Sequence, residues 1–251
     1  FCIVFQQAIA QVPRTRSKKP QQYDFEAGGK RYKIADRAAY DRRLAPFADF
    51  FARALGRPYA LDPREQGDLC IWHDLEVVML GLSSVSNLDG HRPDHATIDD
   101  IALGRALDQL RGDPRIHDGY LKIATFHHPL DSPGNDRLRD ANFLDRLAVA
   151  GFSLVLHGHV HQANSKLFRY DRSAKDRRIE VVGAGTFGAR AVELPTGYPW
   201  QYNLLRFDGC RVRVETRRRE ADNGPWKPYA YWTTGPGKPP QAGYDLDLGR
   251  A

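Results

Sequence analysis

Short apolar runs alternate with amphipathic stretches through the middle of the chain. The runs at residues 69–72, 75–82, 121–126 and 152–156 are aliphatic and β-branched, which predicts strands. Between them, apolar residues that recur at three and four positions predict helices over residues 97–110 and 142–150, the first capped by Thr97. This alternation indicates an α/β fold with at least partly parallel strands.

The two ends of the chain have different patterns. Residues 11–37 are rich in Lys, Arg, Gln and Gly and predict a basic loop, and residues 36–55 predict one amphipathic helix whose aromatic side chains join the core. After residue 165 the chain predicts short strands at 166–170, 179–182, 202–207 and 212–216, with Asp208-Gly209 as a hairpin turn between the last two. Residues 217–251 contain many Pro, Gly and aromatic residues and predict an irregular strap packed on a single domain, residues 1–251.

Two of the predicted strands end in histidines. The run at 121–126 leads into His127 and His128, and the run at 152–156 leads into His157, His159 and His161. Ligands of α/β sheets usually bind at the carboxyl ends of the strands, and neutral imidazole is the commonest side-chain metal ligand. A lone histidine more often makes an ordinary hydrogen bond, but five of the nine histidines occupy these two strand ends. The sequence therefore predicts one metal site.

These strand ends resemble the last two motifs of the calcineurin-like metallophosphoesterases. In that family one strand ends in His, often followed by His-Pro, and another ends in Gly-His-x-His; residues 127–129 and 158–161 match them. Residues 181–187 resemble the family's strand and small-residue turn that follow the site. The resemblance covers roughly residues 68–216.

The resemblance implies a fold, an activity and roles for the histidines. The fold would be a four-layer α/β/β/α sandwich of mixed sheets flanked by helices, with this chain as its C-terminal portion. The activity would be hydrolysis of a phosphate monoester or diester with two divalent ions, Mn, Fe or Zn. His127 and His159 would ligate one ion and His161 the other. His128 and His157 would contact substrate or orient the ligand rings, and Gly158 would allow close backbone approach.

The family's first three motifs, Asp-x-His, Gly-Asp-x-x-Asp and Gly-Asn-His-Asp/Glu, are absent. Gly67-Asp68 and Gly112-Asp113 lack the second Asp, and residues 1–4, which resemble the strand before the third motif, are followed by Phe5-Gln6-Gln7-Ala8. We therefore expect the C-terminal part of a larger phosphoesterase, truncated or frameshifted near Phe5. The alternative is a degenerate domain that binds a metal or an anion without catalysing a reaction.

Composition adds a third hypothesis. A net charge of +6 favours anionic partners, either phosphate esters or nucleic acid, so a basic nucleic-acid-binding protein is a third hypothesis. Residues 217–219 are interpreted as a solvated face, with an anion contact as the alternative. Three widely spaced cysteines, without a Cys-x-x-Cys motif, favour a reducing compartment. No apolar run approaches the ~20 residues needed to cross a bilayer, so we expect a cytoplasmic protein.

Two loops carry secondary candidates. The polar loop at residues 83–93 follows a predicted strand, which makes Asn87 and His91 candidate substrate contacts. Residues 183–188 fit the glycine spacing of a dinucleotide-binding loop, but that fingerprint needs a following helix, and Pro195, Gly197 and Pro199 come too soon. The nicotinamide interpretation is therefore disfavoured.

Overall fold

The structure is a computed structural model that describes residues 9–12, 23–131, 137–138, 140, 142–169, 177–190, 194 and 197–249. Its centre is a six-stranded mixed sheet in the order β4-β5-β6-β7-β9-β8. These strands are β4 (Gly67–Trp72), β5 (Val77–Leu82), β6 (Leu121–Thr125), β7 (Leu154–His157), β8 (Asn164–Arg169) and β9 (Arg178–Gly183). The inner strands β5, β6, β7 and β9 are parallel, and the edge strands β4 and β8 are antiparallel to them. The predicted α/β fold with partly parallel strands is confirmed.

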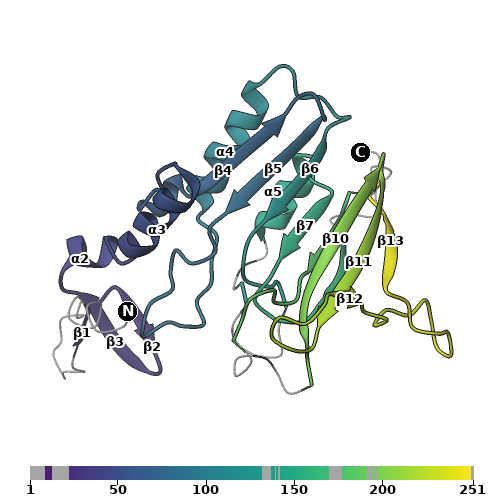
Figure 1. Ribbon diagram of the computed structural model, residues 1–251. Helices are drawn as coiled ribbons and strands as arrows, with labels where there is room; N and C mark the ends of the chain where they lie inside the picture. Colours follow the sequence, from purple (N-terminus) through teal and green to yellow (C-terminus); the bar gives the residue numbers. More distant parts are fainter. Residues whose placement is uncertain are drawn as a thin grey trace.

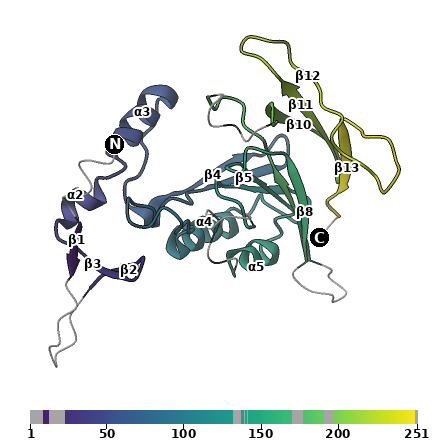
Figure 2. The same ribbon diagram turned by 90° about the horizontal axis from the view of Figure 1, so that it is seen from below.

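Helices α4 (Asp100–Gly112) and α5 (Asn142–Val149) cover one face of this sheet (Figure 2). Leu103 and Leu107 of α4 and Leu144 and Leu147 of α5 are buried in one cluster with residues of β5, β6, β7 and β9. The prediction that Thr97 caps α4 is wrong, because Asp99 accepts the N–H groups of Ile101 and Ala102. Thr97 still lies in a bridge to Val85 and is therefore part of the extended chain before the helix.

The second sheet covers the opposite face of the first (Figure 2). It contains β10 (Trp200–Asp208), β11 (Arg211–Arg219), β12 (Lys227–Pro228) and β13 (Gly243–Asp247), with β10, β12 and β13 all paired to β11. Val212, Val214 and Leu246 of this sheet bury their side chains with Ile123, Leu154 and Val182 of the first. The predicted β10–β11 hairpin is confirmed, and Gly209 supplies the positive φ of 55° in its turn.

The C-terminal region is more regular than the predicted strap over 217–251. Strand β11 continues through Arg219, and both β12 and β13 return to pair with it. The proline and glycine content suggested irregular structure. Short segments of this region nevertheless pair with β11, which shows that composition is a weak guide to strand formation. The expectation that its aromatic residues pack on the domain is met by Trp226, whose ring lies 5.1 Å from that of Phe187 and 4.7 Å from that of Tyr202.

A small N-terminal sheet lies apart from the two main sheets (Figure 1). It consists of β1 (Ile9–Val12), β2 (Phe25–Ala27) and β3 (Lys30–Ile34) in the order β1-β3-β2. The predicted basic loop over 11–37 is therefore corrected, because β2 and β3 form a hairpin whose turn uses positive φ at Gly28 and Gly29. Residues 13–22, with the basic run 14–19, lie outside the described residues.

The single helix predicted over 36–55 is two helices, α2 (Arg37–Asp41) and α3 (Ala45–Leu55), followed by the 3-10 helix η1 (Pro63–Glu65). The break precedes Pro46, whose ring fits only the first turn of a helix. The prediction that the aromatic side chains join a core is confirmed for Tyr40 of α2, which is buried against Phe25. It is wrong for α3, where no residue is buried and Phe50 is 58% exposed. Among the described residues, no helix combines the length and the apolar character needed to span a membrane.

Candidate metal-binding site

The order of the strands brings the two histidine groups together. Strands β6 and β7 are parallel neighbours with Thr125 opposite Leu156, so the residues that follow them leave the sheet at the same edge. The Gly158 N–H donates to the His127 carbonyl oxygen at 3.1 Å and joins the two loops. The prediction that both strand ends meet at one place is confirmed.

His127, His128 and His159 place their potential ligand atoms within 4.8 Å of one another. No other group of three or more His, Cys, Asp or Glu side chains comes as close in the part of the chain that the structure describes. His159 Nδ1 and His127 Nε2 are 3.2 Å apart. Two nitrogens bound tetrahedrally at about 2.0–2.1 Å to zinc would be roughly 3.3–3.4 Å apart. The His127–His159 pair therefore already has the spacing of two ligands of one ion.

Ser84, which the sequence analysis did not identify, hydrogen-bonds to His128. Ser84 Oγ lies 2.8 Å from His128 Nδ1 and accepts the His128 backbone N–H at 3.3 Å, and both residues are buried. When Nδ1 carries its proton and donates it to Ser84, Nε2 keeps the lone pair that a metal requires. Ser84 follows β5, the neighbour of β6, so only the strand order could have identified it.

His157 has a different environment from the three clustered histidines. It is 7% exposed, its Nδ1–H donates to the Gly158 carbonyl oxygen at 3.0 Å, and the Asn164 side chain also hydrogen-bonds to the ring. Burial lowers the pKa of His157. These contacts make His157 a residue that orders the turn into Gly158.

The imidazoles affect one another electrostatically. Desolvation lowers the pKa of His127 first, and the neighbouring His159, His161 and His157 lower it further, although the His127 residue as a whole is exposed to solvent. The neutral form, which is the one that binds metals, is favoured as a result. His161, a predicted metal ligand, is not one of the three clustered histidines, but it is near enough for its charge to act on His127.

The Gly158–Gln162 turn has an unusual backbone. His159 and His161 have φ angles of 69° and 55°, in the left-handed region that residues other than Gly seldom adopt. Gly158 itself does not need to be glycine for space, because a Cβ there would lie 3.6 Å from His127 Nδ1, an ordinary contact. Space within the protein therefore does not require glycine at this position.

Gln201 supports this turn from the second sheet. It is 1% exposed, its Oε1 accepts the Ala163 N–H at 3.1 Å, and its backbone N–H donates to the Thr186 carbonyl oxygen at 2.8 Å. A Cβ at Gly185 would lie 2.4 Å from Gln201 Cβ. The glycine-rich turn therefore serves packing, and the described residues 184–190 after β9 form no helix, which removes the dinucleotide interpretation.

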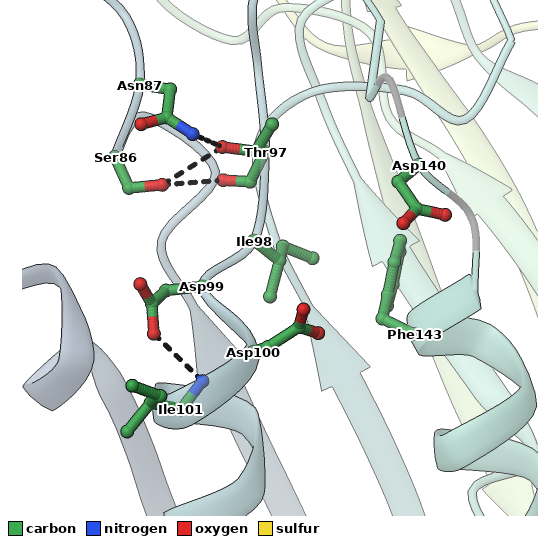
Figure 3. A pocket seen from close by; sticks show the side chains of 9 residues that line it. All are labelled: Ser86, Asn87, Thr97, Ile98, Asp99, Asp100, Ile101, Asp140 and Phe143. Carbon is green, nitrogen blue, oxygen red and sulfur yellow. Dashed lines mark hydrogen bonds between the residues drawn. The ribbon is translucent and has the colours of Figure 1, made fainter. Parts of the chain in front are cut away.

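A separate cavity of about 380 Å³ lies at the start of α4 (Figure 3). Its lining includes the predicted candidate Asn87, which donates to Thr97 Oγ1 at 2.8 Å, whereas His91 stacks on Tyr32 elsewhere, at a ring separation of 4.3 Å. Asp99 in its wall caps α4, and Asp100 pairs with Arg146 at 3.2 Å. No histidine lines it, so it is distinct from the histidine cluster.

Comparison with known proteins gives no assignment. No family model matches the chain, and no curated protein matches it either.

Proposed function

We propose that this chain is a metal-dependent phosphoesterase domain of the calcineurin-like type, in which His127, His128 and His159 hold a divalent ion. The observation that carries the proposal is the convergence of these imidazoles at the carboxyl ends of two adjacent parallel strands. The match of residues 127–129 and 158–161 to the family's last two motifs supports it.

The donor set suits a borderline-soft ion such as Zn, with Fe or Mn as alternatives. Three protein ligands leave a coordination position open, as in catalytic zinc sites. A divalent ion there would polarise a phosphoryl oxygen of the substrate as a Lewis acid. The chain's own contribution would be to favour the neutral form of His127, through desolvation and the neighbouring imidazoles, and to orient His128 through Ser84.

The histidines supply the ligands of one ion. The structure gathers no carboxylate beside them among the described residues, whereas a two-metal centre would need a bridging carboxylate. This observation supports a second candidate function, a non-catalytic metal-binding domain. His161 remains the proposed contact to a second ion.

The finer architecture that we propose is the α/β/β/α sandwich. The layer of α4 and α5, the first sheet and the second sheet would be three of its four layers. Leu204 on β10 is an exposed apolar side chain on the face opposite to Leu205, which packs toward the first sheet, and a covering layer would bury it. Free thiols at Cys70 and Cys210 support the proposal of a reducing, cytoplasmic compartment.

The test is to measure metal uptake and turnover on the same samples. We expect calorimetry to show binding of Zn²⁺ or Mn²⁺ that His159→Ala abolishes, and metal-dependent cleavage of bis-p-nitrophenyl phosphate that disappears with it. His117→Ala is the matched control, because His117 is exposed and faces Glu76 instead of the cluster. Uptake without turnover would favour the binding domain, and no uptake would contradict both.

A further inference from the structure

One face of β11 is buried at one end and exposed at the other. Val212, Val214, Thr216 and Arg218 alternate with the residues between them and so share a face of the second sheet. The two valines and Thr216 are buried, whereas the Arg218 side chain is 39% exposed. The face that packs on the first sheet therefore continues into solvent at Arg218.

Strand β12 adds further side chains beside Arg218. Lys227 stands opposite Arg218 in the antiparallel pair, and residues opposite each other share a face. The Tyr229 N–H donates to the Thr216 carbonyl oxygen at 2.9 Å, so the pairing with β11 continues past Pro228. Lys227 and Tyr229 are two residues apart in the paired segment, which favours the same face for both. The Tyr231 and Trp232 N–H groups both donate to the Gln241 carbonyl oxygen, which interrupts the alternation, so it is the ring contact with Tyr229 that places Tyr231 beside it.

These side chains form a continuous row that ends at the histidine turn. The Arg218 guanidinium lies 5.0 Å above the Tyr229 ring, and the Tyr229 and Tyr231 rings are 5.3 Å apart. The Gln162 side-chain amide donates to the Tyr231 hydroxyl, and Gln162 directly follows His161. We call Lys227, Arg218, Tyr229 and Tyr231 the Arg–Tyr row.

The row is fixed to the second sheet. Trp232, the next residue after Tyr231, donates its indole N–H to Thr216 Oγ1 at 2.8 Å and packs on Tyr244. A cavity of about 190 Å³ lies beside the cationic end, lined by Arg218, Glu220, Ala221, Gly224, Pro225 and Lys227. The Arg218–Glu220 pair, at 3.1 Å, is exposed, so a stronger anion can replace Glu220 at little cost.

We propose that the Arg–Tyr row binds single-stranded nucleic acid and directs it to the histidine cluster. Bases stack on Tyr229 and Tyr231, and Arg218 and Lys227 neutralise backbone phosphates, which is the combination that single-strand binding surfaces use. The net charge of +6 favours such a polyanion. The proposal that the row directs nucleic acid to a cleavage site rests on the proposed phosphoesterase function. The proposal that the row binds nucleic acid does not depend on that function.

The test is fluorescence anisotropy of a short labelled oligothymidylate, measured in chelator so that no metal contributes. Loss of a stacked ring should weaken binding about 10-fold in Tyr229→Leu, which keeps an apolar side chain for packing, and in Tyr231→Ala. Arg218→Gln should reduce the slope of log affinity against log salt by about 0.7. Tyr231→Phe, which loses only the hydroxyl to Gln162, should retain stacking and most of the affinity.

Matched control variants distinguish binding at the Arg–Tyr row from nonspecific attraction between the basic protein and the oligonucleotide. Tyr23→Leu and Arg111→Gln alter an exposed tyrosine and an exposed arginine elsewhere, and both should bind as the unaltered protein does. His159→Ala should keep full oligonucleotide binding while it loses metal uptake, so failure of one proposal is distinguishable from failure of the other. Equal affinity in Tyr229→Leu and Tyr231→Ala, with folding checked by circular dichroism, would overturn the inference, as would equally tight binding of a duplex.

Discussion

Ser84 and His128 are joined by a hydrogen bond of 2.8 Å between Oγ and Nδ1, although 44 residues separate them in the chain. The bond connects the loop after β5 to the end of β6, the adjacent parallel strand. It fixes which ring nitrogen of His128 faces the cluster, because the other is engaged.

Ser84→Ala should weaken metal binding about 10-fold, since loss of a partner that orients a ligand typically costs that much affinity. Isothermal titration with Zn²⁺ measures it. Ser86→Ala is the control, because the Ser86 hydroxyl donates to the Thr97 carbonyl oxygen in the same loop and does not contact a histidine. Equal losses in both variants would show that the loop, and not the Ser84–His128 bond, is responsible.

Asp89→Asn should destabilise the protein by about 3 kcal/mol at neutral pH, because it leaves Arg92 without its buried partner. Desolvation raises the pKa of Asp89, but hydrogen bonds from Arg92 and from the His91 N–H, together with the Arg92 charge, lower it overall. The stability from a lowered carboxyl pKa is present above the unfolded value, 3.8, and is lost as the pH falls through the folded value.

The difference in unfolding free energy between Asp89→Asn and the unaltered protein should therefore shrink as the pH falls below 3.8. Urea titrations over an acid pH series measure this difference. If this difference in unfolding free energy stayed constant over the acid pH series, Asp89 would act through its shape and not its charge.

Gly185→Ala should destabilise the protein by about 1–3 kcal/mol, because the added Cβ would lie 2.4 Å from the Cβ of Gln201, which is buried. Gly188→Ala in the same turn is the control, since a Cβ there meets nothing within 4 Å. The free energy of unfolding in urea compares the two. If Gly188→Ala were the more costly change, the packing explanation for the glycine-rich turn would fail.

Thr216→Val should cost about 1–3 kcal/mol of unfolding free energy, because it leaves buried polar groups without partners. Thr216 Oγ1 accepts the Trp232 indole N–H at 2.8 Å and donates to Asn203 Oδ1 at 2.9 Å, and Asn203 donates to the Gly183 carbonyl oxygen. Thr233→Val, at an exposed threonine that donates to the Gly235 carbonyl oxygen, should have little effect. Thermal unfolding distinguishes them, and equal melting temperatures for the two variants would contradict the prediction.

The sequence by itself determined the α/β core and the places where histidines leave it. The apolar runs at 121–126 and 152–156 became β6 and β7, because a run of aliphatic residues between turn signals is a local property of the chain. Local patterns failed where two residues compete, as Thr97 and Asp99 did for the cap of α4. They also failed where burial depends on distant partners, as for the exposed aromatic residues of α3.

Only the tertiary structure decided which side chains meet. The parallel order of β5, β6 and β7 placed Ser84 behind His128 and grouped His128, instead of His161, with His127 and His159. The packing of the second sheet brought Gln201 under the histidine turn and Tyr231 against Gln162. These contacts join residues far apart in the chain, and no periodicity along the sequence encodes which strands become neighbours.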